Sequence, residues 1–267
     1  MSSLAVNSPP LSLLSTDPSM SKKLIIYSVL TRLWGNPSTK RVPHGTLTEN
    51  GAGKLSAFTP EALQYIRSLG ATHVWFIGLL EHATKTDYSA YGITPDHPDT
   101  VKGQAGSPYA VKDYYDIDPD LADDPLRRQE ELDALIHRTH EAGLQVVMDF
   151  IPNHVARSYH SDACPEGTVD LGATDDSSQA FSPRNNFYYL PDSTLILPLS
   201  TSSSPYEEHP ARATGNDCFS PRPTICDWYE TVKLNYGVDY CGDGGLHADP
   251  LPDTWVKMRD ILLYWAG

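Results

Sequence analysis

The sequence predicts an α/β fold in which parallel strands alternate with helices. Two observations support this fold class: three short apolar segments are rich in β-branched residues, and amphipathic helical patterns lie between them. Strand, helix, strand, helix, strand is the order of βαβ units, whose strands pair in parallel. With 267 residues, 40% of them hydrophobic, the chain is long enough for one sizeable domain with a large insertion.

The first strand is predicted at 24–30, where β-branched and apolar residues favour a strand buried on both faces. A stretch rich in Gly, Asn, Ser and Pro over 35–53 predicts a loop. The first helix follows, because Thr59 is a suitable N-cap and Pro60 suits the first helical position. We expect this helix to end at Gly70.

The second and third strands are predicted at 73–80 and 144–150, both almost entirely apolar. Between them, residues 81–124 form a long polar connection, and a connection of that length in a compact domain is usually functional. A second amphipathic helix begins after Asp124 and ends at Gly143. These elements complete the strand–helix alternation.

After residue 155 the periodic pattern disappears for nearly a hundred residues. Asp, Ser, Pro, Gly and Asn dominate 156–252, so we predict an irregular insertion that follows the third strand. The helical pattern returns at Asp253, which we expect to cap a helix reaching Gly267. A parallel α/β fold would continue with a fourth strand, and we expect that strand to lie outside these residues.

Composition and charge exclude several classes of protein. The net charge of −14 (20 Lys and Arg, 34 Asp and Glu) repels phosphate backbones, so we expect no nucleic-acid partner and no acidic lipid surface. No apolar run approaches the ~20 residues of a membrane span, so no membrane is expected. Residues 1–22 lack the basic start of a signal peptide, and we expect a disordered extension on a cytoplasmic protein.

Two groups of potential metal ligands are better explained without a metal. His137 and His140 are expected on a helix surface. The cysteines form no CxxC pair, so a zinc site is disfavoured, and reduced thiols are favoured over a disulfide. They are Cys164, Cys218, Cys226 and Cys241.

The most distinctive segment is Asp149-Phe-Ile-Pro-Asn-His154, at and just past the end of the predicted third strand. Sites in parallel α/β folds assemble at that edge of the sheet. Pro152 prevents further strand pairing and turns the chain outward, which presents Asn153 and His154. The alternative is that Asp149 and Asn153 only fix a loop and that His154 is an ordinary hydrogen-bonded side chain.

A second candidate is the aromatic and acidic run over 107–119. Exposed tyrosine faces stack on the apolar faces of sugar rings, and Asp and Lys side chains reach hydroxyl groups, so the run suits a neutral, polyhydroxylated ligand. The alternative is a tyrosine-rich loop that packs on the fold. The sequence contains no GxSxG, P-loop, GxGxxG or HExxH motif.

These segments resemble the signature regions of the α-amylase family of glycoside hydrolases. Residues 149–154 match the family's D-x-x-x-N-H segment, and 140–149 match its H-x-x-G-h-x-V-h-h-D run, where h is apolar. Residues 106–115 are similar to its G-Y-x-x-x-D-Y segment, and 180–189 and 227–237 look like the insertion of bacterial members. Three linked motifs in order make the resemblance specific, and it covers roughly residues 23–267.

The resemblance implies an incomplete (β/α)8 TIM barrel with an irregular domain B after the third strand. Residues 23–155 would form the first three βα units, 156–252 domain B, and 253–267 the next barrel helix. From the residues alone, the rival is a complete flavodoxin-like or other open sheet.

The resemblance also implies a partial sugar site. Tyr109 would stack under the sugar at the cleavage subsite and His154 would donate to its hydroxyl, with Asp149 and Asp113 as structural support. Asn153 matches a position that ligates a structural Ca²⁺ in many members; no organic cofactor is implied. Its other ligands would come from outside these residues or from the aspartates of the insertion. These are Asp170, Asp175, Asp176, Asp217, Asp227, Asp239, Asp243 and Asp249.

Retaining hydrolysis needs two carboxylates, which the family carries after the fourth and fifth strands, with a third Asp after the seventh. We therefore expect the N-terminal portion of an enzyme acting on α-glucans such as starch and maltooligosaccharides. No catalytic carboxylate is expected within the 267 residues, and the chain alone should be inactive. The alternative is a non-catalytic glucan-binding chain, or one that a second, complementing polypeptide completes.

Overall fold

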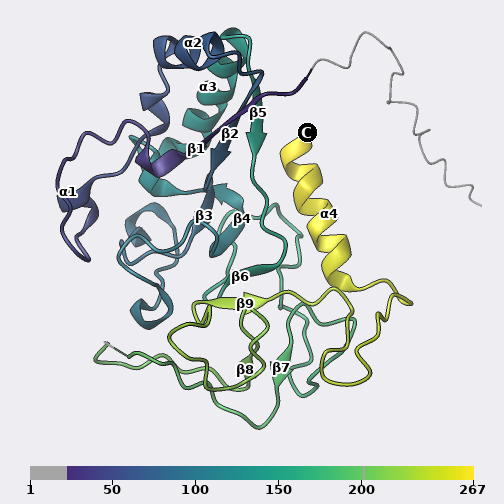
Figure 1. The fold of residues 1–267 in the computed structure, drawn as a ribbon. Coiled ribbons are helices and arrows are strands. Elements are labelled where there is room, and N and C mark those ends of the chain that lie inside the picture. Colours follow the sequence, from purple (N-terminus) through teal and green to yellow (C-terminus); the bar gives the residue numbers. More distant parts are fainter. Residues whose placement is uncertain (1–22, 201) are drawn as a thin grey trace, which may run out of the picture.

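The computed structural model describes residues 23–200 and 202–267; the expected disordered extension over 1–22 lies outside the described residues. A three-stranded parallel sheet in the order β1-β2-β5 lies in the upper part of the view in Figure 1, next to α2 and α3. The strands are β1 (Ile26–Leu30), β2 (His73–Ile77) and β5 (Gln145–Met148). Their register places Val29 beside Phe76 and Phe76 beside Met148. The predicted parallel pairing of three apolar strands is confirmed.

The two predicted helices between these strands are α2 (Pro60–Ser68) and α3 (Arg128–Glu141). The Thr59 side chain accepts a hydrogen bond from the Ala62 backbone N–H at 3.3 Å, so the predicted N-cap is confirmed. Gly70 and Gly143 follow the helices with φ of +89° and +76°, the left-handed conformation that ends a helix at glycine. Helix α2 therefore begins where predicted, and both helices end where predicted. Helix α3 begins three residues later than predicted, because Asp124 caps a 3-10 turn over Pro125–Arg127 that precedes it.

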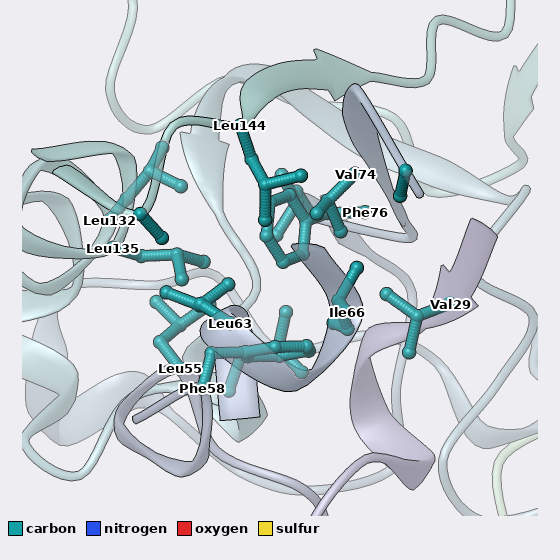
Figure 2. Packing of buried hydrophobic residues seen from close by; sticks show 14 of the residues in the cluster. Val29, Leu55, Phe58, Leu63, Ile66, Val74, Phe76, Leu132, Leu135 and Leu144 are labelled. Carbon is teal, nitrogen blue, oxygen red and sulfur yellow. The ribbon is translucent and has the colours of Figure 1, made fainter. Parts of the chain in front are cut away.

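The main hydrophobic core lies between these helices and one face of the sheet (Figure 2). Leu63 and Ile66 of α2 and Leu132 and Leu135 of α3 pack on the same side, each at most 1% exposed. The strands contribute Val29, Val74 and Phe76. Burying each large aliphatic side chain contributes about 1.5–3 kcal/mol, so this layer fixes the sheet against the helices.

The opposite face of the sheet is not covered in the same way. Ile26 is 51% exposed and Trp75 is 36% exposed, and both alternate with core residues along their strands. The prediction that the first strand is buried on both faces is therefore wrong, because both connecting helices lie on one side. The order β1-β2-β5 also excludes a flavodoxin-like sheet, in which the first strand lies between the second and third.

The connection between β2 and α3 contains an antiparallel pair that the sequence did not predict. Gly78, at φ +74°, ends β2, so the single strand expected over 73–80 is divided. The pair consists of β3 (Leu80–His82) and β4 (Val111–Ile117). Every residue of β4 is buried, including its charged ones, so the polar connection is part of the core.

The predicted insertion is irregular apart from short strand pairs. They join β6 (His154–Ala156) to β9 (Thr231–Lys233) and β7 (Tyr189–Leu190) to β8 (Ala211–Arg212). The remaining helices are α1 (Leu47–Asn50) and α4 (Asp253–Ala266).

Helix α4 covers the predicted C-terminal segment, and Pro252 rather than Asp253 is its N-cap. Asp253 is the first helical residue, one position inside the predicted cap. The helix packs Met258 and Ile261 against the cluster around β4, and Trp265 Nε1 donates to the Tyr114 carbonyl at 2.7 Å. Within the described ranges, no helix has both the length and the apolar character needed to cross a membrane.

Candidate functional site

Asp149 links the carboxyl ends of two neighbouring parallel strands. It follows β5, and its Oδ1 accepts a hydrogen bond from the Gly78 backbone N–H, just past β2, at 3.1 Å. Its Oδ2 is buried and has no partner among the residues that the structure describes. Burial raises the pKa of Asp149, and the Gly78 N–H opposes that shift. Support of the site by Asp149 stays a prediction.

His154 is the first residue of β6, and its neighbour Asn153 determines which ring nitrogen of neutral His154 carries the proton. The Asn153 amide nitrogen donates to His154 Nδ1 at 3.0 Å and to the Gly215 carbonyl at 2.8 Å. Because an amide nitrogen only donates, Nδ1 accepts, and the ring proton of neutral His154 lies on Nε2. Burial lowers the pKa of His154 and Lys233 lowers it further, against a hydrogen bond to the Tyr109 backbone. His154 is therefore a neutral N–H donor at pH 7.

Tyr109, His154 and Trp228 form one cluster, called here the aromatic–histidine cluster. The Tyr109 main chain lies near the His154 ring and raises the pKa of His154, so residues from two segments meet here. The Tyr109 side chain is 45% exposed, and the Trp228 ring, 44% exposed, lies with its centroid 5.2 Å from that of His154. The cluster combines apolar ring faces with a hydrogen-bond donor, a combination that suits a sugar ring.

Trp228 was not predicted as a site residue. The only signal in the sequence was its place in the 227–237 stretch, which gives no indication that the ring packs on His154. Pairing of β6 with β9 brings the two segments together, and Asn216 Oδ1 accepts from the Trp228 backbone N–H at 3.1 Å. The contact depends on tertiary structure and could not be deduced from local spacing.

The rest of the aromatic and acidic run does not face a ligand. Tyr114, Lys112 and Asp113 are at most 2% exposed, so the expectation that Asp and Lys of this run reach sugar hydroxyls is wrong for these residues. Asp113 accepts hydrogen bonds from the Ser161 hydroxyl at 2.7 Å and the Ala163 backbone N–H at 3.1 Å. These hydrogen bonds link β4 to the start of the insertion. Neither of them involves Tyr109 or His154.

The charges of β4 belong to a buried ion network. Lys112 Nζ lies 3.3 Å from Glu81 Oε1 and 3.7 Å from Asp96 Oδ2, and Arg128 Nε donates to Asp116 Oδ1 at 2.6 Å. Burial raises the pKa of Glu81 to about 8, although Lys112 opposes the shift. The network explains how a charged strand is buried in the middle of the fold.

Replacing Glu81 by Gln should remove a pH dependence of stability. The folded pKa of about 8 lies above the ordinary value of 4.5, so folding takes up a proton between these values. The contribution of Glu81 is complete below pH 4.5 and is lost as the pH rises through about 8, by at most ~1.4 kcal/mol per pH unit. Urea unfolding at pH values from about 5 to 9 measures this dependence. The free energy of unfolding should change less with pH in E81Q than in wild type.

Glu166→Gln, at an exposed position, is the matched control and should leave the profile unchanged. An identical slope in E81Q and wild type would show that Glu81 does not titrate in this window.

Among the described residues, two clusters of three potential metal ligands have ligand atoms close enough together to share an ion. Both clusters are held by contacts within the fold. Glu81, Asp113 and Asp116 belong to the buried network just described. The other group is Asp239, Asp243 and His247, in which Asp243 accepts from the Gly245 N–H at 2.7 Å and the His247 ring lies 3.2 Å away.

The chain is similar in sequence to known proteins. A family model described as "Alpha amylase, catalytic domain" matches residues 44–188, more than half of the chain. A cyclomaltodextrinase from Bacillus sp is 28% identical over 143 residues, which cover 53% of this chain and 22% of that protein. Maltase 1 from Drosophila virilis is 26% identical over 163 residues, which cover 60% of this chain and 21% of that protein. The chain therefore spans about a fifth of the length of these relatives.

Two solved structures are also similar to this chain. An α-amylase from Lactobacillus plantarum is 21% identical, with 91% of this chain and 35% of that chain covered and a TM-score of 0.46. A cyclic α-maltosyl-(1→6)-maltose hydrolase from Arthrobacter globiformis is 18% identical, with 91% and 42% covered and a TM-score of 0.47.

Proposed function

The chain belongs to the α-amylase family of glycoside hydrolases, and from that premise we propose that it supplies the sugar-binding part of a retaining enzyme for α-glucans. The observation that carries the proposal is the aromatic–histidine cluster. Tyr109 and His154 come from separate segments; the Tyr109 main chain lies near the His154 ring, which packs on the Trp228 ring. Two exposed rings beside a neutral N–H donor fit a glucose unit better than they fit an ionic or apolar ligand.

The fold proposed for residues 23–155 is the first three βα units of a (β/α)8 barrel. Sequential parallel strands, helices on one face, and an uncovered opposite face support this proposal. Residues 156–252 would be domain B and 253–267 the next barrel helix. The other strands would come from a further part of the protein or from a complementing polypeptide, and they would cover Ile26 and Trp75.

In the proposed mechanism, the exposed face of Tyr109 stacks on the glucose ring, and the Nε2–H of His154 exchanges the Tyr109 carbonyl for a glucose hydroxyl. One carboxylate then attacks the anomeric carbon while a protonated carboxyl group gives its proton to the leaving oxygen. Water hydrolyses the glycosyl-enzyme, and the same acid group accepts the water proton. We propose that both carboxylates lie outside the 267 residues, because Asp149 is held by Gly78 and faces no second carboxylate among its hydrogen-bond partners.

A structural Ca²⁺ at Asn153 is a further part of the proposal. The Asn153 amide nitrogen is bound to His154 and Gly215, which leaves the amide oxygen for a cation that prefers oxygen ligands. When bound, the ion would hold the 149–154 segment against the insertion. The chain's own residues would still place the His154 donor, since the bond from Asn153 to Nδ1 orients the ring.

Replacing Tyr109 or His154 by Ala should weaken binding of maltoheptaose about tenfold, because each removes one contact worth roughly 1.4 kcal/mol. Isothermal titration calorimetry on the full chain measures the effect. Tyr65→Ala and His137→Ala are matched controls at exposed helix positions and should bind like wild type. Equal affinity in all four variants, with unchanged unfolding midpoints, would remove the basis of the proposed function.

A further inference from the structure

A groove with an unusual charge is lined mainly by residues of the β1–α2 and β3–β4 connections. It consists of two cavities of about 510 and 490 Å³ that adjoin at His44, Gly103 and Gln104. Each volume lies in the range typical of small-ligand sites. Five of the 20 Lys and Arg residues of the chain line this basic groove, although the chain has a net charge of −14. They are Arg32, Lys40, Arg41, Lys85 and Lys102.

Most of these cations lack an acidic partner. Lys102 pairs with Glu230 at 2.9 Å, whereas the other four form no ion pair with any carboxylate in the described part of the chain. The two acidic residues of the lining face other groups. Asp120 is 3% exposed and accepts the Tyr88 hydroxyl, and Asp99 accepts the Ser200 hydroxyl at 2.9 Å. The groove therefore has an excess of positive charge.

The walls of the groove are held in place before any ligand binds. Arg32 donates to the Gly106 carbonyl at 3.0 and 3.1 Å and to the Ala105 carbonyl at 3.2 Å, so its guanidinium is fixed without neutralisation. On the other wall, Asn50 exchanges hydrogen bonds with the Val42 backbone at 2.8 and 2.9 Å. Such preorganisation reduces the entropy lost on binding.

His44, where the two cavities meet, has φ of +55°. A non-glycine residue in this left-handed region is uncommon, and such strain concentrates at ligand-binding positions. Around it, the Gln104 amide group and the Thr86 hydroxyl make no side-chain hydrogen bond to any described residue, so both can bind hydroxyl groups. Ala105, which lines the groove, precedes Tyr109 by four residues in the chain.

We propose that the basic groove binds an α-glucan chain that carries a phosphate ester. Arg and Lys side chains suit a phosphate group, the free amide and hydroxyl donors suit sugar hydroxyls, and the volume admits more than one sugar unit. The glucan part of this inference rests on the proposed function. The negative charge is inferred from the groove itself. An acidic peptide is the alternative ligand, and polyglutamate tests it.

Calorimetric titration of the full chain tests the proposal with four probes: maltoheptaose, maltoheptaose bearing a 6-phosphate, inorganic phosphate and polyglutamate. We expect the phosphorylated sugar to bind about tenfold more tightly than maltoheptaose at low salt, and salt to reduce this preference. K40A/R41A should abolish the preference and leave maltoheptaose binding unchanged. Lys85→Ala, in the second cavity, should reduce it as well.

The double variant R127A/R259A is the matched control, because both arginines are exposed and lie outside the groove lining. It removes the same charge and should keep the preference. Equal affinity for the two sugars would overturn the groove proposal alone, since maltoheptaose binding would still support the proposed function. Binding of neither sugar would overturn both. Competition by polyglutamate or inorganic phosphate at the same concentration as the phosphorylated sugar would show a general anion site and contradict the proposal.

Discussion

Purified as the 267-residue chain, the protein is expected to show no measurable hydrolysis of starch or maltooligosaccharides. Without a nucleophile and a proton donor at one glycosidic bond, no glycosyl-enzyme forms, and a rate enhancement of at least ~10⁶-fold is lost. Release of reducing ends from maltoheptaose measures this. Co-expression with a polypeptide that carries the remaining barrel strands and both carboxylates should restore turnover.

The matched control is the same complementing polypeptide with its nucleophile replaced by Ala, which should restore solubility without activity. Turnover by the 267-residue chain alone at rates typical of such enzymes would contradict the account. It would mean that two carboxylates within these residues form the catalytic pair.

Arg157→Ala is expected to destabilise the insertion by about 3–5 kcal/mol, the cost of breaking a buried ion pair from one side. Arg157 is 1% exposed and donates to Glu208 Oε1 at 2.6 Å and to the Tyr229 and Thr231 carbonyls at 2.7 and 2.9 Å. Burial alone would raise the pKa of Glu208, but Arg212 and Arg157 outweigh it and lower that pKa to about 2. Removing Arg157 leaves the buried Glu208 carboxylate with Arg212 as its remaining cationic partner.

Urea unfolding followed by tryptophan fluorescence measures the loss in R157A. Arg184→Ala, at an exposed position in the same insertion, should change the free energy of unfolding by less than about 0.5 kcal/mol. Equal stability of R157A and wild type would show that the Arg157–Glu208–Arg212 cluster does not hold the insertion together. Because β6 and β9 meet next to Arg157, the variant should also weaken maltoheptaose binding at His154.

The helices and the parallel sheet follow from local sequence signals. Thr59 and Pro60 determine where α2 begins, and Gly70 and Gly143 occupy left-handed positions that other residues adopt at a cost. The apolar strands follow from β-branched composition, but which face of β1 is covered depends on which helices pack there. The exposure of Ile26 therefore depends on where the helices pack against the sheet. The residues next to Ile26 in the sequence do not determine it.

Strand β4 shows where prediction from sequence stops. Its charged residues are typical of a solvated loop. They are buried because Glu81 and Asp96 pair with Lys112, Arg128 pairs with Asp116, and Ser161 and Ala163 donate to Asp113. Such compensation is visible only in three dimensions. The same holds for the site: the 149–154 motif identified His154, whereas Trp228 joins it only through the pairing of β6 with β9.

The central claim is that a glucan binds at the aromatic–histidine cluster, and ¹⁹F NMR of the chain labelled with 5-fluorotryptophan tests it most directly. The chain has five tryptophans, and Trp228→Phe identifies the resonance of the one that contacts His154. On titration with maltoheptaose, we predict a saturable shift of the Trp228 resonance and none for Trp34, which is in the core contact with Phe58. The shift should disappear in H154A. A saturable shift confined to other tryptophans, or no shift at concentrations where calorimetry detects binding, would contradict the account.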